Sequence, residues 1–256
     1  MDKAADNVSG YTWMVNTFQK VDGTTLKLSD LSIKENLNPT VAKLYLLSSS
    51  GATLVDDNGN KCVYVYLNPN KATGTKVSGW YLDGTTSANM TGPSSAGWAN
   101  DVEIPYGQGF GIFRGTTVAT LIFSGSVAAG DQDIEAKNPS GYTWMGNVMP
   151  VDLTLSDLQI IENLNPTVAK LYLLSSTGAT LVDDKGNKCV YVYLNPSKAT
   201  GTKVAGWYLD GTPSANMIGP SSAGWANDVS IKAGQGFGIF RGTTKATIRV
   251  PSPLAD

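Results

Sequence analysis

The chain has 256 residues, a formal net charge of −2 and no histidine, and 41% of its residues are hydrophobic while only 16% are charged. This balance excludes a disordered chain, and the lack of a basic excess argues against a nucleic-acid partner. No apolar run is long enough to predict a transmembrane helix, so we expect no membrane insertion. No signal peptide opens the sequence, but the composition favours the mature form of an extracellular or cell-surface protein over a cytoplasmic one.

Most of the sequence is present twice. Residues 40–117 match residues 167–244 at a constant offset, with 9 of the 78 positions different. Such high identity indicates a recent duplication and predicts two tandem domains, residues 1–127 and 128–256, with the boundary near Ala128. Because the copies are so alike, the positions that differ are the informative ones.

The copies also differ in length near their beginnings. The sequence SGYTWM starts at Ser9 and again at Ser140, and the first copy has four more residues between Thr17 and Leu28. Surface loops tolerate such changes at low cost. We therefore expect this segment to be a loop that leads into a strand.

In chain order, short runs of β-branched and aromatic residues alternate with turn residues, and no segment has convincing helical periodicity. At most, the sequence LSDL forms a single turn. The last two expected strands form a C-terminal hairpin, after a long loop over residues 87–101. The strands expected in the first copy lie at residues 43–47, 52–56, 61–67, 76–84 (a short strand with a turn), 107–115 and 118–123.

Individual positions sharpen this prediction. In residues 102–107 the two outward positions, Glu103 and Pro105, differ between the copies while Ile104 does not, which indicates a half-buried strand. Gly59 is expected in a left-handed conformation in the turn before residues 61–67. Short strands separated by frequent turns predict an all-β protein of two nearly identical β-sandwich or barrel-like domains. The linker, residues 124–141, could add an edge strand.

The two cysteines, Cys62 and Cys189, occupy equivalent positions. A disulfide between them would require the two domains to bring equivalent strands together. We therefore expect small hydrophobic side chains in half-buried strands, not a disulfide.

The absence of histidine removes the commonest general base and metal ligand, and we expect no enzyme, no cofactor and no metal. A glycan-active enzyme is the remaining catalytic alternative. It would need paired carboxylates such as Asp83 and Asp101, or Asp210 and Asp228 in the second copy. Both aspartates of a pair also fit ordinary turns.

Calcium is a weaker alternative at the turn that begins with Asp56. Its middle oxygen ligand would be Asn58, but the second copy has Lys185 there, which would place a cation beside the ion. A hairpin turn explains this sequence better.

The tryptophans support the hypothesis that the protein binds carbohydrates. Exposed rings can stack on the apolar face of a sugar while carboxylates such as Asp83 and Asp210 bind its hydroxyls. The opposing interpretation is that the tryptophans fill the core. The candidate rings are Trp80 and Trp98 in the first copy and Trp207 and Trp225 in the second.

The glycines of the YGQGFGIFRG run alternate, at Gly107, Gly109 and Gly111. A phosphate-binding loop would need a strand that leads into a helix. We expect instead that the glycines leave one strand face bare, so that a large ring such as tryptophan can lie against the backbone.

The order GYTWMGN, LTLSDL, GWYLDGT and NDVSIKAGQGF resembles a repeated β module of bacterial secreted and cell-surface proteins. That pattern begins with G-N-x-x-P, which Gly146, Asn147 and Pro150 fit, whereas the first copy departs from it at Val15 and Lys20. The resemblance implies a secreted β module of unassigned role and transfers no catalytic residue. The middle and end of the pattern fit Trp80, Trp207, Ile104, Pro105 and Gly107 to Phe110.

These observations predict a non-enzymatic secreted or cell-surface protein with a structural or adhesive role, which self-associates through copies of itself. The alternative is a pair of carbohydrate-binding modules whose partners are glycans, with two sites raising avidity for a polymer.

Overall fold

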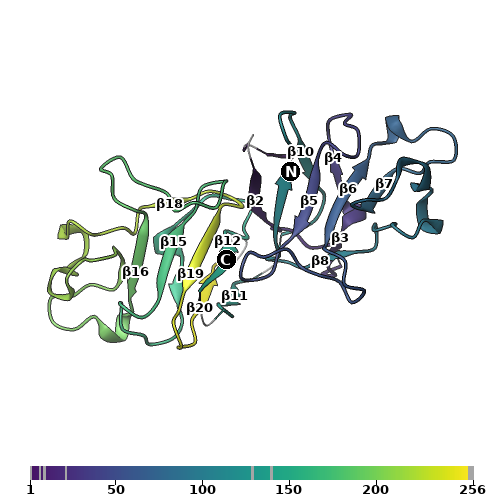
Figure 1. Ribbon diagram of the computed structural model, residues 1–256. Coiled ribbons are helices and arrows are strands. Elements are labelled where there is room, and N and C mark those ends of the chain that lie inside the picture. The colour runs from purple at the N-terminus through teal and green to yellow at the C-terminus, as the bar shows by residue number, and fades with distance from the viewer. Residues whose placement is uncertain are drawn as a thin grey trace. The chain divides into compact units, whose positions relative to one another are not determined.

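The computed structural model describes residues 2–5, 7, 10–20, 22–127, 130–138 and 141–252 (Figure 1). The chain divides into two compact units: unit 1 comprises Met1–Ser48 and Ala52–Val127, and unit 2 comprises Ser49–Gly51 and Ala128–Asp256. The boundary that the sequence predicts near Ala128 lies outside the described residues.

The described residues form strands and single-turn 3₁₀ helices, so the protein is all-β, as predicted. The single turn predicted at LSDL is a 3₁₀ helix in both copies. The strands of unit 1 are β1 (Asp2–Ala4), β2 (Tyr11–Val15), β3 (Leu26–Lys27), β4 (Leu31–Ile33), β5 (Lys43–Leu46), β6 (Val63–Leu67), β7 (Gly79–Leu82), β8 (Glu103–Ile104), β9 (Gly109–Phe113) and β10 (Thr120–Phe123). Its 3₁₀ helices are η1 (Leu28–Asp30), η2 (Pro69–Lys71), η3 (Ser87–Asn89) and η4 (Gly92–Ser94).

Unit 2 repeats this order of elements. Its strands are β11 (Gln132–Glu135), β12 (Tyr142–Gly146), β13 (Leu153–Thr154), β14 (Gln159–Ile160), β15 (Lys170–Leu173), β16 (Val190–Leu194), β17 (Gly206–Leu209), β18 (Ser230–Ile231), β19 (Gly236–Phe240) and β20 (Thr247–Val250). Its 3₁₀ helices are η5 (Leu155–Asp157), η6 (Pro196–Lys198), η7 (Ser214–Asn216) and η8 (Gly219–Ser221).

The described residues of each unit form three antiparallel sheets. In unit 1 a five-stranded sheet has the order β2-β9-β5-β6-β7, a three-stranded sheet has the order β1-β10-β4, and β3 pairs with β8. Unit 2 has the same arrangement, with orders β12-β19-β15-β16-β17, β11-β20-β14 and β13-β18. The edge strand expected in the linker is β11, which pairs with β20.

All three sheets of unit 1 contribute side chains to one hydrophobic core. We call the face of the five-stranded sheet that lines this core its inner face, and the opposite face its outer face. Leu44 and Phe110 lie on the inner face, and the smaller sheets supply Leu121 and Ile104. Burial of these apolar side chains is the main source of stability for such a unit.

A buried asparagine stabilises the chain just after β2. The side-chain amide of Asn16 donates to the carbonyl of Ile104 at 2.8 Å, and its oxygen accepts from the N–H of Phe18 at 3.0 Å. Asn147 in unit 2 likewise donates to Val151 and Ile231. Both asparagines are fully buried, so these hydrogen bonds satisfy groups that would otherwise be costly to bury.

Strand β6 is more deeply buried than the sequence predicts. Its alternation is confirmed, because Val65 and Leu67 lie in one cluster while Tyr64 lies in the main core. The strand was expected to be half-buried, but both of its faces are covered, because a second small cluster with Tyr81 and Met90 covers the outer side.

One predicted strand and one predicted pairing are wrong. Residues 52–56 form only isolated bridges, such as Leu47 with Thr53, instead of a continuous strand. The C-terminal hairpin is also absent: β9 pairs with β2 and β5, which occupy both of its edges. Strand β10 therefore pairs with β1 and β4 in the three-stranded sheet.

The predicted turns and surface positions are confirmed. Gly59 has φ = 82° and Gly186 has φ = 84°, the left-handed conformation that favours glycine. Glu103 and Pro105 are exposed, whereas Ile104 between them is fully buried.

The described part of the chain contains no helix of the length and apolarity needed to cross a membrane. Cys62 and Cys189 are both free and buried.

Candidate functional site

The outer face of the five-stranded sheet in unit 1 carries a group of aromatic rings. Tyr11 and Trp13 come from β2, Tyr45 from β5 and Phe113 from β9. The ring centroids of Tyr11 and Tyr45 lie 4.7 Å apart in an edge arrangement, and those of Tyr11 and Trp13 lie 5.6 Å apart. Tyr11 is 36% exposed, so this group reaches solvent.

A glycine in β9 makes room for these rings. Gly111 pairs with Trp13 on one side and with Tyr45 on the other. A Cβ at Gly111 would lie 3.4 Å from the Cβ of Tyr11 and 3.7 Å from the Trp13 ring. This confirms for Gly111 the prediction that a glycine leaves the strand face bare for aromatic rings; a Cβ at Gly109 would meet Leu47 and no ring.

The equivalent rings of unit 2 enclose a small pocket. Its volume is about 160 Å³, and its exposed lining is mainly apolar. The ring centroids of Tyr142 and Tyr172 lie 4.6 Å apart, and Tyr142 is 41% exposed. The pocket is lined by Tyr142, Trp144, Tyr172, Leu174, Gly178, Thr180 and Gly238.

An ion pair borders the aromatic rings in each unit. Lys43 Nζ lies 2.7 Å from Asp83 Oδ2, and Lys170 Nζ lies 2.7 Å from Asp210 Oδ2. Burial, together with the nearby Tyr11 and Asp83, raises the pKa of Tyr45 to about 12. Tyr45 therefore remains a neutral hydroxyl that can donate or accept a hydrogen bond at physiological pH.

Asp83 and Asp210 lie beside Tyr45 and Tyr172, and not beside the tryptophans that the sequence analysis paired with them. We call Tyr11, Trp13, Tyr45, Gly111 and Asp83 the aromatic face of unit 1. The aromatic face of unit 2 consists of the equivalent residues Tyr142, Trp144, Tyr172, Gly238 and Asp210.

Trp80 and Trp207 cannot serve as stacking platforms, which corrects the prediction for these two residues. Both side chains are 0% exposed. The indole N–H of Trp80 donates to the carbonyl of Leu31 at 2.9 Å, and that of Trp207 donates to Leu158 at 2.8 Å. These rings fill the cores, in agreement with the opposing interpretation.

Trp98 and Trp225 are partly buried. Trp98 packs against Tyr81, with ring centroids 5.2 Å apart, and a Cβ at Gly79 would lie 2.9 Å from the Trp98 ring. Trp225 has the same relation to Tyr208. These rings close the small cluster over the outer side of the sheet, so their main contacts are structural.

The carboxylates that an enzyme would require have separate partners. Asp83 pairs with Lys43 of the five-stranded sheet, whereas Asp101 lies 3.3 Å from Lys27 Nζ of β3. The two aspartates are thus tied to different sheets.

The turn at Asp56 uses its carboxylate internally. Its Oδ1 accepts from the N–H groups of Asn58 and Asn60, at 3.0 and 2.8 Å. These bonds hold the pKa of Asp56 below its usual value. Among the described residues, no group of three or more potential metal-ligating side chains comes together.

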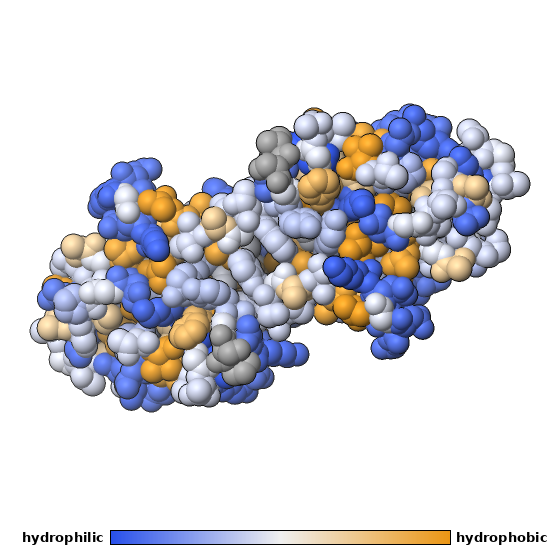
Figure 2. Space-filling model, in the orientation of Figure 1, coloured by the Kyte–Doolittle hydropathy of each residue, from blue (hydrophilic) through white to orange (hydrophobic). Residues whose placement is uncertain are grey.

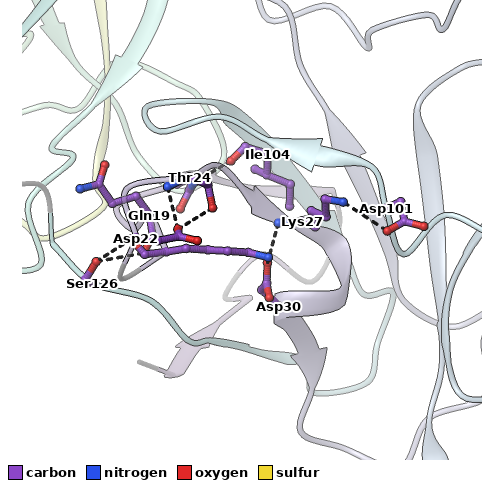
Figure 3. A network of polar contacts seen from close by, with 10 residues as sticks. Gln19, Asp22, Thr24, Lys27, Asp30, Asp101, Ile104 and Ser126 are labelled. Atoms are coloured by element: carbon purple, nitrogen blue, oxygen red, sulfur yellow. Dashed lines mark hydrogen bonds and ion pairs between the residues drawn. The ribbon is translucent and has the colours of Figure 1, made fainter.

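A separate polar network ties the Thr17–Leu28 segment to its surroundings in unit 1 (Figure 3). Lys20 Nζ lies 3.3 Å from Asp30 Oδ2, and the N–H of Lys27 donates to the same oxygen at 2.7 Å. The backbone of Gln19 pairs with that of Ser126. These contacts hold the segment against η1 and the strand-end residues of unit 1, which indicates a structural role.

Sequence reasoning missed Trp13 and Trp144. Two signals could have identified them: the alternation of YTWM, which places Tyr and Trp on one strand face, and the expectation that a ring lies against the glycine-rich strand. What the sequence does not give is the pairing of β2 with β9, which brings both signals together.

Known proteins offer no guide to this site: no protein-family model matches the chain, and neither a curated protein nor a solved structure is significantly similar to it.

Proposed function

We propose that this chain is a non-catalytic adhesive protein that binds saccharides through the aromatic face of each unit. In this proposal the units are two tandem β-sandwich-like domains of an extracellular or cell-surface protein. The sandwich is supported by the shared core of unit 1, to which the five-stranded sheet and the smaller sheets both contribute.

The observation that carries the proposal is the pocket of unit 2. Three aromatic residues, Tyr142, Trp144 and Tyr172, line it above the bare backbone of Gly238. Its volume of about 160 Å³ suits a single sugar ring better than a larger cofactor, for which pockets commonly exceed ~300 Å³. Aromatic rings offer the apolar surface that the C–H face of a pyranose requires.

The neighbouring polar groups fit sugar hydroxyls. Tyr172 provides a neutral hydroxyl, since burial raises its pKa to about 12, and Asp210 and Lys170 provide an acceptor and a donor. Because the aspartate and lysine neutralise each other, the site carries no excess charge. This favours neutral sugars over uronic or sialic acids.

The exposed surface gives little support for a large hydrophobic docking area. On the face drawn in Figure 2, apolar residues form several separate areas among polar ones. Large exposed hydrophobic residues such as Val55, Val118 and Val182 lie at turns or near strand ends. A saccharide that stacks on a few rings fits this surface better than a broad protein interface does.

A calorimetric titration tests the proposal. The probes are linear α-1,4-glucose, β-1,4-glucose and β-1,4-mannose oligomers of one to six units. We expect saturable binding of at least one series, weakened about tenfold when Trp13→Ala and Trp144→Ala are combined, because each removes a stacking ring.

The matched control is the double variant Trp98→Phe and Trp225→Phe, whose rings lie outside the aromatic faces and which should retain binding. Loss of binding in the control with full retention in the Trp13 and Trp144 variant would contradict the proposal. So would the absence of binding to every oligomer.

A further inference from the structure

Unit 1 contains a cavity that is larger than the pocket of unit 2 and lies beside the aromatic face of unit 1. Its volume is about 530 Å³, and it is formed by residues 82–97 around η3 and η4. Most of its side chains are polar and small. Those that could reach a bound molecule are Asp83, Thr86, Asn89, Thr91, Ser94 and Ser95. We call this cavity the loop pocket.

The loop that forms this pocket is held firmly against the sheet. The hydroxyl of Tyr81 donates to the carbonyl of Val77 at 2.6 Å and accepts from the N–H of Gly92 at 2.9 Å. The N–H of Leu82 donates to the carbonyl of Gly97 at 2.7 Å. These bonds anchor both ends of the loop, so its polar groups are in place before a ligand arrives, which lowers the entropic cost of binding.

Asp83 belongs to both regions. It lines the loop pocket, and its carboxylate also pairs with Lys43 beside Tyr45 of the aromatic face. The side chain of Asp83 is 34% exposed, so it remains accessible to a ligand. A molecule that lies on the rings of β2 and β5 and continues past β7 therefore reaches the loop pocket at this residue.

We infer that the loop pocket is a further subsite for the same ligand, and that the ligand of unit 1 is a linear oligosaccharide that runs across the strands. This inference rests on the proposed function. Four strand spacings separate β2 from β7, a distance of ~19 Å, which several linked hexoses are needed to span. Hydroxyl and amide side chains in the loop pocket match a sugar that is bound by hydrogen bonds, whereas the aromatic face binds by stacking.

The residues that line the loop pocket differ between the two units. Thr86 and Thr91 of unit 1 are replaced by Pro213 and Ile218 in unit 2, so two of the nine differences between the copies fall on residues that line the loop pocket. Ile218 is 37% exposed. Unit 2 therefore lacks two hydroxyls at this subsite, and we expect it to gain less affinity from additional sugar units than unit 1 does.

The test uses full-length chains in which one aromatic face is silenced. Tyr142→Ala with Trp144→Ala leaves unit 1 as the binding unit, and calorimetry measures its affinity for the same hexose oligomers of one to six units. Affinity should rise about tenfold from the disaccharide to the tetrasaccharide or longer. Adding Thr86→Pro and Thr91→Ile should remove this rise while disaccharide affinity is unchanged.

The reciprocal chain silences unit 1 with Tyr11→Ala and Trp13→Ala and carries Pro213→Thr and Ile218→Thr. It should gain a dependence on length that its parent lacks, and this gain keeps the test informative even if the loop substitutions in unit 1 destabilise the fold. Disaccharide binding without any rise in affinity with length would overturn the inference but leave the proposed function intact. The same holds if Thr86→Pro and Thr91→Ile have no effect on a folded chain. Absence of binding to every oligomer would overturn both.

Discussion

The two units have the same aromatic face but different surroundings. Tyr45, Gly111 and Asp83 have identical equivalents in unit 2. The nine positions that differ between the matched copies are all at least partly exposed in unit 1. The two units therefore carry the same residue types on the aromatic face and differ at positions that are not buried in unit 1. If each unit binds a saccharide as proposed, differences in specificity between the units arise in their loops, whereas their stability arises in core residues that the two units share.

The segment between the first long strand and the first 3₁₀ helix also differs between the units, in its length and in the residues that hold it. In unit 1 the longer Thr17–Leu28 segment is tied down by Lys20 and Asp30. In unit 2 the shorter segment uses Asp152, which accepts from Lys232 Nζ at 2.8 Å and from the N–H of Ala233 at 2.9 Å. Lys232 replaces Pro105 of the first copy, so one substitution supplies the partner for the shorter loop.

The largest expected effect comes from the shared core. Trp80→Ala and Trp207→Ala each remove a fully buried ring and its hydrogen bond to a buried carbonyl. Each should lower the free energy of unfolding of its own unit by about 3–5 kcal/mol. Urea denaturation followed by circular dichroism measures this loss, and a clear difference between the two variants would show that the cores are not equivalent.

A smaller effect is expected at the buried asparagines. Asn16→Ala and Asn147→Ala leave buried carbonyl and N–H groups without their side-chain partner. We expect a loss of about 1–3 kcal/mol in each case. Thermal unfolding would reveal it, and an unchanged melting temperature would mean that water replaces the amide.

The acid stability of unit 1 depends on Glu35. Burial raises the pKa of its carboxyl, but hydrogen bonds from Thr120 Oγ1 at 2.7 Å and from its N–H at 2.6 Å outweigh burial and hold the pKa below its ordinary value. The stabilisation is therefore present above the pKa of the unfolded chain, ~4.3, and is lost as the pH falls through the lower pKa of the folded state.

Glu35→Gln should consequently cost about 1 kcal/mol at pH 7 and weaken the fall in stability below pH 5. Denaturation curves at pH 7 and pH 3 check both effects. An unchanged pH dependence in the variant would show that other carboxyls dominate acid unfolding.

The smallest effect is expected at the turn that differs between the copies. Asn58→Lys and Lys185→Asn exchange exposed side chains. The glycine that follows each position and the aspartate that begins each turn are unchanged. Each exchange should alter stability by less than about 0.5 kcal/mol. A larger change on denaturant unfolding would indicate that this position contributes more than its exposure suggests.

The sequence predicts turns and the alternation of side chains along strands well, but it predicts poorly which strands pair with each other. Turn glycines, the alternation of β6 and the edge strand β11 follow from residue types and spacing alone. The C-terminal hairpin is predicted wrongly because β9 and β10 are close in sequence and connected by a turn, yet both edges of β9 are taken by more distant strands.

The candidate site shows the same limit. Residue type suggested tryptophans and aspartates, and Asp83 does lie beside aromatic rings. Whether a given tryptophan is buried depends on which sheet face meets the core, and a single-residue shift in phase separates Trp80 from Tyr81. For this reason residue type alone points to the buried Trp80 and does not single out Trp13, which lies on the outer face.

Chemical-shift mapping with a disaccharide tests the central claim most directly. On titration into the isotope-labelled chain, the amide signals of Gly111 and Gly238 and the indole signals of Trp13 and Trp144 should move together, while the indole signals of Trp98 and Trp225 should not. Shifts confined to Trp98, Trp225 and their loops, or no shifts with any of the three disaccharides, would contradict binding at the aromatic faces.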